Sequence, residues 1–180
     1  PYILVANHAS DLDPPALSAS LPWEALRRVY WSGDRGRLFA SALSRRFCRA
    51  VHIFPVDERA PGATLAMAEE VLARGNCLVW FPESWRTPDG KLQRFRPGIG
   101  ALLLRRPVPL VPTWIDGTFE ALPGTKRLPK PHPLRVRFGA PIDPASLVQA
   151  AGGDPIAIAS RLRDEVAALA PGARSGDAAG

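Results

Sequence analysis

Short apolar runs alternate with helical segments along most of the chain, and this alternation restricts the fold more than any other feature of the sequence. Apolar runs of about five residues, bounded by turn signals, are typical of buried strands. Strands separated by helices favour an α/β layered domain with a largely parallel or mixed central sheet flanked by helices. The predicted strands are Tyr2–Ala6, Ala50–Phe54, Cys77–Phe81, Val108–Ile115 and Leu134–Phe138. One predicted helix begins at Asp13, and the others cover Asp34–Phe47, Ala63–Gly75, 98–106 and Asp154–Ala170.

Local signals indicate the helix ends and the domain limits. Asp13 precedes two prolines, a pattern that is typical of an N-cap followed by the first helical turn. Gly75 is expected to end the helix before it. The chain has 180 residues and opens within a strand, on Pro1 rather than Met. We therefore expect one domain over residues 1–170 with its N-terminal part missing, and a disordered tail over residues 171–180.

Composition narrows the classes of partner. The 23 Lys and Arg residues outnumber the 17 Asp and Glu residues, giving a net charge of +6. This excess favours an anionic partner such as a phosphate-bearing ligand, a lipid surface or nucleic acid, although solubility alone would also account for it. Cys48 and Cys77 form no CxxC pair, which argues against a zinc site or a disulfide framework and favours a reducing compartment. No run approaches the ~20 apolar residues of a membrane-spanning helix.

Polar motifs follow the predicted strands where the strands end: NHASDLD, FPVDER, FPESWR and PTWIDGT. In open α/β sheets, ligand sites gather at the carboxyl edge of the strands. In the first motif, a turn between His8 and Asp13 would bring them within hydrogen-bond reach. A carboxylate bonded to one imidazole nitrogen fixes the tautomer and leaves the other nitrogen basic. The pair therefore has the composition of a general base that activates a hydroxyl.

Other interpretations of these residues stay open at this point. Asp13 would serve only as a helix cap if His8 were an ordinary turn residue. His8, Asp11 and Asp13 also offer three potential metal ligands, but no second histidine cluster supports a metal site, and we expect none. The sequence contains no G-x-S-x-G nucleophile elbow of the serine hydrolases.

The order of the motifs resembles that of the glycerophospholipid acyltransferase family, the PlsC-like group. NHASDLD resembles the family's NHxxxxD block, and FPESWRTPDGKLQRFRPG is similar to its FPEGTRSxDGxLxxFxxG block. VPLVPTWIDGT resembles the late proline block, so the resemblance covers about residues 2–140. Residues 118–143 are also similar to acyltransferase domains that are fused to acyl-activating synthetase domains. The resemblance implies a glycerol-3-phosphate acyltransferase-like α/β fold.

The same resemblance implies direct acyl transfer without an acyl-enzyme, a metal or a cofactor. His8 would take a proton from a hydroxyl of a glycerol-phosphate or lysophospholipid acceptor, and that oxygen would attack the thioester carbonyl of acyl-CoA or an acyl carrier protein. Asp13 would orient and support His8. An Arg at the acceptor site suits a phosphate because its guanidinium binds phosphate oxygens in pairs. The positions that match the family's substrate-binding blocks are Glu83, Ser84, Arg86, Gly98, Pro112 and, in the second block, Arg59.

Two stretches depart from the family pattern. Ser84 and Trp85 stand where the family has Gly-Thr, and the bulk of Trp85 is expected to reshape the acceptor pocket. In the second block, Glu58 stands where the family has Arg, and Arg59 follows one residue later. From there Arg59 either reaches a phosphate or is a solvated loop residue.

Two basic stretches extend the expected contacts beyond the substrates. Residues 27–49 hold seven Arg and one acid, Asp34, interleaved with aromatic and aliphatic residues. Such a segment suits the headgroup layer of an anionic membrane, and a solvated helix face is the alternative. Residues 126–137 would meet the phosphates of CoA or the acidic face of a carrier protein. Neither stretch carries a nucleic-acid motif, so we expect no nucleic-acid partner and a cytoplasmic protein that is peripheral at the inner face of the cell membrane.

Three functions follow from these residues. The first is a membrane-associated acyltransferase, and the second is a thioesterase-like hydrolase that uses the same base to activate water. The third is a non-catalytic domain that docks on anionic lipid or on a fused synthetase. Acid release without an acceptor would favour the hydrolase, and lipid binding by a catalytically silent protein would favour the docking domain.

Overall fold

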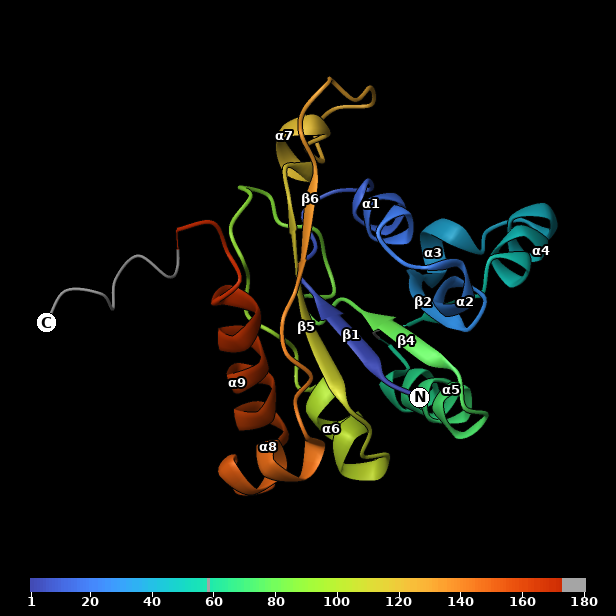
Figure 1. Ribbon diagram of the computed structural model, residues 1–180. Coiled ribbons are helices and arrows are strands. Elements are labelled where there is room, and N and C mark those ends of the chain that lie inside the picture. Colours follow the sequence, from blue (N-terminus) through green and yellow to red (C-terminus); the bar gives the residue numbers. More distant parts are fainter. Residues whose placement is uncertain (58, 173–180) are drawn as a thin grey trace, which may run out of the picture.

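The central sheet consists of β1 (Ile3–Ala6), β2 (Val29–Asp34), β3 (Ile53–Val56), β4 (Cys77–Trp80), β5 (Leu110–Asp116) and β6 (Arg135–Phe138). The computed structural model describes residues 1–57 and 59–172. The strands are ordered β3-β2-β4-β1-β5-β6. Each neighbouring pair from β3 to β5 is parallel, and β6 runs antiparallel to β5. The predicted α/β domain with a largely parallel, mixed sheet is therefore confirmed (Figure 1).

The helices are α1 (Asp13–Ala19), α2 (Trp23–Leu26), α3 (Arg35–Leu38), α4 (Ala42–Ala50), α5 (Pro61–Ala73), α6 (Gly98–Arg105), α7 (Thr118–Ala121), α8 (Pro144–Ala150) and α9 (Pro155–Ala167). They cover both faces of the sheet and create two apolar layers. Ile3 and Val5 of β1 join a core built largely from α5, α6 and α9. Leu4 and Ala6 point to the opposite face and join a smaller core with α1, as the alternation of side chains along a strand requires.

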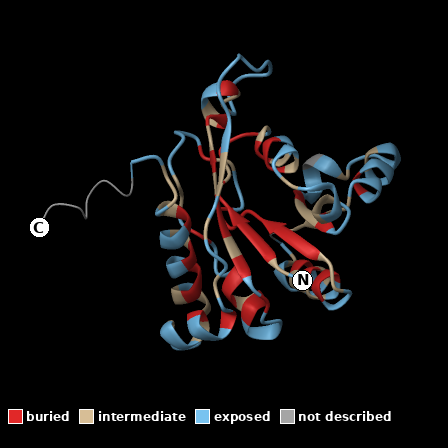
Figure 2. Cartoon of the chain, viewed as in Figure 1, coloured by how far each residue is buried: buried red, intermediate tan, exposed pale blue. Residues whose placement is uncertain are grey.

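The central strands β1 and β4 are buried along their whole length, while the outer faces of the helices are exposed (Figure 2). Burial on both faces explains why these strands are continuous apolar runs rather than alternating ones. Helix α6 packs against α9 at Gly100, where a Cβ atom would collide with the backbone of Pro155. The close contact between these helices therefore depends on glycine at this position.

The structure differs from the prediction between residues 27 and 50. The sequence pattern indicated one helix over Asp34–Phe47, but the chain forms strand β2 and then two short helices, α3 and α4. Strand β2 is held by pairing with β3 and β4, which are distant in sequence and leave no local signal. Gly33 permits this packing because a Cβ atom there would lie 2.6 Å from Cγ2 of Ile53.

The structure also tests the predicted end of helix α5 and the predicted start of strand β3. Gly75 lies just after α5 with a φ of 77°, the left-handed conformation in which glycine commonly ends a helix. Strand β3 begins at Ile53 rather than at Ala50. Of the predicted disordered tail, residues 173–180 lie outside the described residues. None of the helices described has both the length and the apolar character needed to cross a membrane.

Candidate active site

Three strands bring their carboxyl ends together at one edge of the sheet. His8 follows β1, Phe81 follows β4, and Thr118 follows β5. The strands lie in register, with Val5 beside Trp80 and Ala6 beside Thr113. The polar motifs that follow these strands therefore meet in space, as their positions in the sequence predicted.

His8 and Asp13 form the closest polar pair of this edge. Nδ1 of His8 lies 2.8 Å from Oδ2 of Asp13, and the side chain of Asp13 is fully buried whereas that of His8 is 19% exposed. A carboxylate at Asp13 can only accept a hydrogen bond, and this contact therefore favours the tautomer with the proton on Nδ1 and leaves Nε2 as the basic nitrogen. The arrangement can therefore take a proton from a hydroxyl that enters from solvent.

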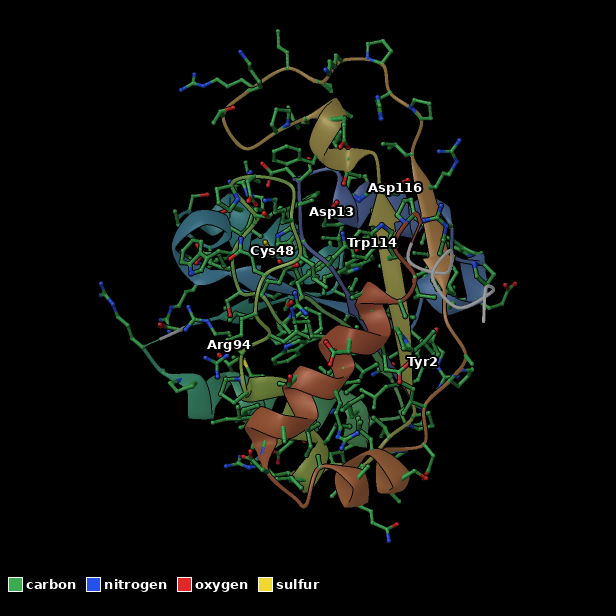
Figure 3. All side chains as sticks on the ribbon, turned by 90° about the vertical axis from the view of Figure 1, so that its left-hand side faces the viewer. Tyr2, Asp13, Cys48, Arg94, Trp114 and Asp116 are labelled. Carbon is green, nitrogen blue, oxygen red and sulfur yellow. The ribbon has the colours of Figure 1, made fainter. Side chains whose placement is uncertain are left out.

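Asp13 also fixes the turn that carries His8. Its Oδ2 accepts hydrogen bonds from the backbone nitrogens of Ala9 at 2.6 Å and Ser10 at 2.8 Å. Its Oδ1 accepts one from the Thr118 hydroxyl at 2.5 Å, and Figure 3 shows Asp13 near the end of β5, below α7. The prediction that Asp13 is the N-cap is wrong, since Leu12 occupies that position. The preceding turn, and not the helix, donates to the carboxylate.

The imidazole of His8 is held in place from other directions as well. The ring of Phe81 stacks on it with a centroid distance of 4.4 Å and an interplanar angle of 25°. The backbone nitrogen of His8 donates to Oε1 of Glu83 at 2.6 Å, and its carbonyl accepts from the nitrogen of Thr87 at 3.0 Å. The position of the ring is thus set by both the first and the third motif.

Glu83 is buried, and backbone groups use both of its oxygens. Oε1 accepts from the nitrogen of His8, and Oε2 accepts from the nitrogen of Gln93 at 2.7 Å. Burial raises the pKa of the Glu83 carboxyl above its usual value of 4.5, although these two hydrogen bonds act in the opposite direction. The assignment of Glu83 to the acceptor stays a prediction, and its contacts support a role in positioning His8.

We expect Glu83→Gln to lower both stability and turnover. The amide nitrogen of Gln would face the backbone N–H of either His8 or Gln93, so one buried donor would lose its acceptor. Such a loss costs about 1 to 3 kcal/mol. Urea unfolding and initial rates would measure the two effects, and a variant as stable and active as the wild type would contradict the positioning role.

The raised pKa of Glu83 also sets a pH dependence. A carboxyl whose pKa is raised by folding binds its proton more tightly in the folded chain than in the unfolded chain. Its contribution to stability is therefore complete below pH 4.5, the usual value, and is lost as the pH rises through the folded pKa. The side chain of Gln does not titrate, so it makes no such contribution. The difference in unfolding free energy between the wild type and Glu83→Gln should therefore favour the wild type more at pH 4.5 than at neutral pH. Urea unfolding of both proteins at the two pH values would measure it.

A cleft of about 220 Å³ opens beside His8. Arg86 lies in it, and its Nη1 is 2.7 Å from Oδ2 of Asp11. Ser84 has a φ of 68°, the left-handed region that favours glycine, which explains why the resembling family has Gly there. The cleft is lined by His8, Ser32, Gly33, Asp34, Val56, Trp80, Phe81, Ser84, Trp85 and Arg86. His8, Ser84 and Arg86 therefore share one opening, while Asp13 lies behind His8.

Arg59, Gly98 and Pro112 are not part of this lining. Arg59 is exposed on the turn after β3, where its backbone nitrogen donates to Oδ1 of Asp57 at 2.9 Å. Gly98 begins α6. Pro112 is buried in β5, where its carbonyl accepts from the nitrogen of Gly139 at 2.8 Å. Glu58 lies outside the described residues.

The structure adds Asn7 and Thr118, which sequence reasoning did not single out, and it gives Asp11, predicted only as a potential metal ligand, a different contact. Asn7 bonds both backbone groups of Ile115, donating through Nδ2 at 2.9 Å and accepting at Oδ1 at 2.7 Å. Thr118 and Asp11 contact Asp13 and Arg86, respectively. Asn7 and Asp11 lie within the first motif and Thr118 lies at the end of the fourth. The motifs were therefore the sequence signal that could have pointed to these contacts. In the described part of the chain, no group of three carboxylate, His or Cys side chains is placed to hold a metal.

Comparisons with known proteins agree with the motif order. The family model described as Acyltransferase matches residues 1–116. The chain belongs to the acyltransferase family. The match includes every residue that lines the cleft around His8. It confirms the resemblance seen in the motifs; the similarity to domains fused to synthetases stays a prediction.

Several relatives with similar sequences are named 1-acyl-sn-glycerol-3-phosphate acyltransferases. A 1-acyl-sn-glycerol-3-phosphate acyltransferase of Limnanthes alba is 29% identical over 150 residues, which cover 78% of this chain and 50% of the relative. The alpha form from Homo sapiens is 29% identical over 120 residues, 62% of this chain and 39% of the relative. The chain thus spans about half the length of such relatives or less.

A solved structure has the same fold. The crystal structure of the 1-acyl-sn-glycerophosphate acyltransferase PlsC from Thermotoga maritima superposes with a TM-score of 0.69 at 24% identity. The superposition covers 93% of this chain and 66% of that one. The acyltransferase-like architecture predicted from the sequence is therefore confirmed.

Proposed function

We propose that this domain transfers a fatty acyl group from a thioester donor to the free hydroxyl of a 1-acyl-glycerol-3-phosphate. The observation that carries the proposal is the buried Asp13 carboxylate bonded to Nδ1 of His8, at 2.8 Å, with the ring at a cleft that also contains Arg86. The printed names of the relatives from Limnanthes and Homo sapiens support the choice of acceptor.

In the proposed reaction, Nε2 of His8 takes the proton of the acceptor hydroxyl while its oxygen forms a bond to the thioester carbonyl carbon. The negative charge of Asp13 stabilises the imidazolium that results. As the tetrahedral intermediate collapses, the carbon–sulfur bond breaks. The imidazolium then returns the proton to the departing thiolate, so the protein ends the cycle unchanged. The donor is a thioester of CoA or of an acyl carrier protein, and rates with each thioester identify it.

A thioester-consumption assay with and without lysophosphatidate tests the proposal. We expect consumption to depend on the acceptor and a diacylated phosphate product to form in equal amount. Equal consumption without the acceptor, with release of free fatty acid, would instead identify a hydrolase that activates water at His8. If neither acyl transfer nor hydrolysis occurs with the CoA thioester or with the carrier-protein thioester, a docking domain would be the better account.

We expect Arg86→Ala to weaken use of the acceptor more than use of the thioester. A charge-assisted hydrogen bond contributes about 1.5 to 3 kcal/mol, which corresponds to roughly a ten- to hundredfold rise in KM for lysophosphatidate. Arg86→Lys keeps the charge but not the paired donors, so it should restore only part of the affinity.

Arg105→Ala provides a matched control for the Arg86 variant. Arg105 ends α6 and pairs with Glu69, with Nη1 3.0 Å from the carboxylate, and it takes no part in the cleft lining. Its removal should leave both KM values near those of the wild type. If Arg86→Ala raises the KM of the thioester and not that of the acceptor, the guanidinium belongs to the donor side of the cleft.

A further inference from the structure

Helix α4 exposes its largest apolar side chains instead of burying them. Leu43 is 79% exposed and Phe47 is 62% exposed, whereas Cys48 is the buried residue of this helix. Leu43 and Phe47 are four residues apart and therefore share one side of the helix. Figure 2 shows α4 almost entirely in the colour of exposed residues. Because Cys48 is the buried residue of α4, the helix leaves an apolar ridge, formed by Leu43 and Phe47, exposed to its surroundings.

Positive charge surrounds this ridge. Helix α4 carries Arg45, Arg46 and Arg49 and no acidic residue between Ala42 and Ala50. All of these arginines are exposed. Neither Arg46 nor Arg49 forms an ion pair with a residue that the structure describes. The ridge therefore combines exposed apolar groups with cations that remain available to an anionic partner.

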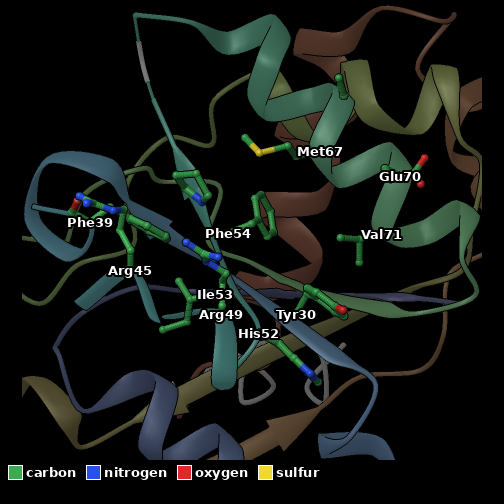
Figure 4. Close-up of a pocket in the computed structure, with 12 residues that line it drawn as sticks. Tyr30, Phe39, Arg45, Arg49, His52, Ile53, Phe54, Met67, Glu70 and Val71 are labelled. Carbon is green, nitrogen blue, oxygen red and sulfur yellow. The ribbon is translucent and has the colours of Figure 1, made fainter. Parts of the chain in front are cut away.

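An apolar groove of about 710 Å³ continues from α4 toward α5. Arg45 and Arg49 enter it from α4, and Met67 and Val71 line it from α5, as Figure 4 shows. Strand β2, whose end contributes Asp34 to the cleft at His8, leads directly into α3 and α4. Leu43 and Phe47 do not line this groove, which Arg45 and Arg49 enter from another side of the helix. A short segment of chain links α4 to the strand that lines the cleft.

We propose that α4 is a docking surface for an anionic phospholipid bilayer. Leu43 and Phe47 insert among the upper acyl carbons, while the arginines contact lipid phosphates in the headgroup layer, the arrangement of basic amphipathic helices at membranes. A second copy of this chain fits the ridge poorly, because a symmetric contact through α4 would bring the same cations face to face. This inference goes beyond acyl transfer and does not require it.

Co-sedimentation of the full chain with vesicles tests the inference. The probe is a phosphatidylcholine vesicle with roughly a third phosphatidylglycerol, compared with pure phosphatidylcholine and with increasing salt, because electrostatic attraction to anionic lipid is screened by ions. We expect binding to the anionic vesicle that weakens with salt. Leu43→Ser combined with Phe47→Ser should lower the partition coefficient at least about tenfold, and Arg46→Glu should lower it by about the same factor.

Matched controls separate the ridge from general surface properties. Leu128→Ser removes an apolar side chain that is 84% exposed in the loop after α7. Arg161→Glu makes the same charge change on α9, which lies far from α4 in Figure 1. Both controls should bind vesicles like the wild type. Equal losses in the ridge variants and the controls, or no wild-type binding at all, would overturn the inference.

Two further measurements separate the alternatives. His8→Ala should bind vesicles like the wild type, so failure of the proposed chemistry and failure of the docking surface have different signatures. Analytical ultracentrifugation tests the second copy as an occupant: a dimer that Leu43→Ser with Phe47→Ser dissociates would assign the ridge to self-association and reject the bilayer.

Discussion

Replacing His8 by alanine is expected to lower turnover by roughly a hundred- to ten-thousandfold, the usual contribution of a positioned general base. The variant should fold normally, because the imidazole is partly exposed and Asp13 keeps its bonds to the backbone nitrogens of Ala9 and Ser10. Initial rates of acceptor-dependent thioester consumption would measure the loss of turnover, and thermal unfolding would check that the fold is retained.

His132→Ala is the matched control, because His132 is an exposed histidine in the loop between α7 and β6. It should leave the turnover unchanged. If His8→Ala consumed thioester at the wild-type rate, His8 could not be the base, and the turn would have to be regarded as a scaffold for some other group in the cleft.

The contact between His8 and Asp13 could be predicted from the sequence because it is local. His8 and Asp13 are five residues apart, so one turn and one helix start are enough to join them. The partners of the third motif are not local in this sense. Glu83 reaches His8 across 75 positions, and Thr118 reaches Asp13 across 105. The position of the motifs at the strand ends predicted that the motifs share a site, but only the packed sheet shows which atoms meet.

The same distinction between local and distant contacts explains which strands could be predicted from the sequence and which could not. Ile3–Ala6 and Cys77–Trp80 were predicted because burial on both faces requires a continuous apolar run. Strand β2 was missed because Tyr30, Trp31 and Ser32 are only partly buried and its basic surroundings resemble a helix face. Its strand conformation comes from pairing with β3 and β4. Tertiary pairing thus overrides the local pattern in the strand that forms one wall of the cleft.

The error about Asp13 has a physical origin that bears on function. An acid before two prolines is typical of a cap, which would accept from the helix that follows. Here the residue lies one position inside α1 and accepts from the turn before it. A capping carboxylate would point toward the helix axis and away from the cleft. The observed one connects the His8 ring, its turn and α7.

Asp13→Asn is expected to lower turnover by roughly a thousandfold while costing little stability. The amide oxygen can take the place of Oδ2 and keep the bonds from His8, Ala9 and Ser10. The amide nitrogen can face Thr118, whose hydroxyl accepts as well as donates. The change therefore removes the negative charge with little change in geometry, and an imidazolium without that charge is a poorer product of the proton transfer. Rates and urea unfolding of the same preparation would measure both effects.

Asp13→Ala separates the charge of this residue from its role as a scaffold. Alanine leaves the buried N–H groups of Ala9 and Ser10 without their acceptor, and each such loss costs about 1 to 3 kcal/mol. We therefore expect the Ala variant to be clearly less stable than the Asn variant but no more active. Wild-type turnover in Asp13→Asn would show that the carboxylate only shapes the turn. A stable Ala variant would show that the turn keeps its conformation without the carboxylate. Because the two variants differ in whether the backbone donors keep an acceptor, together they distinguish a general base supported by a buried charge from a histidine that is merely well packed.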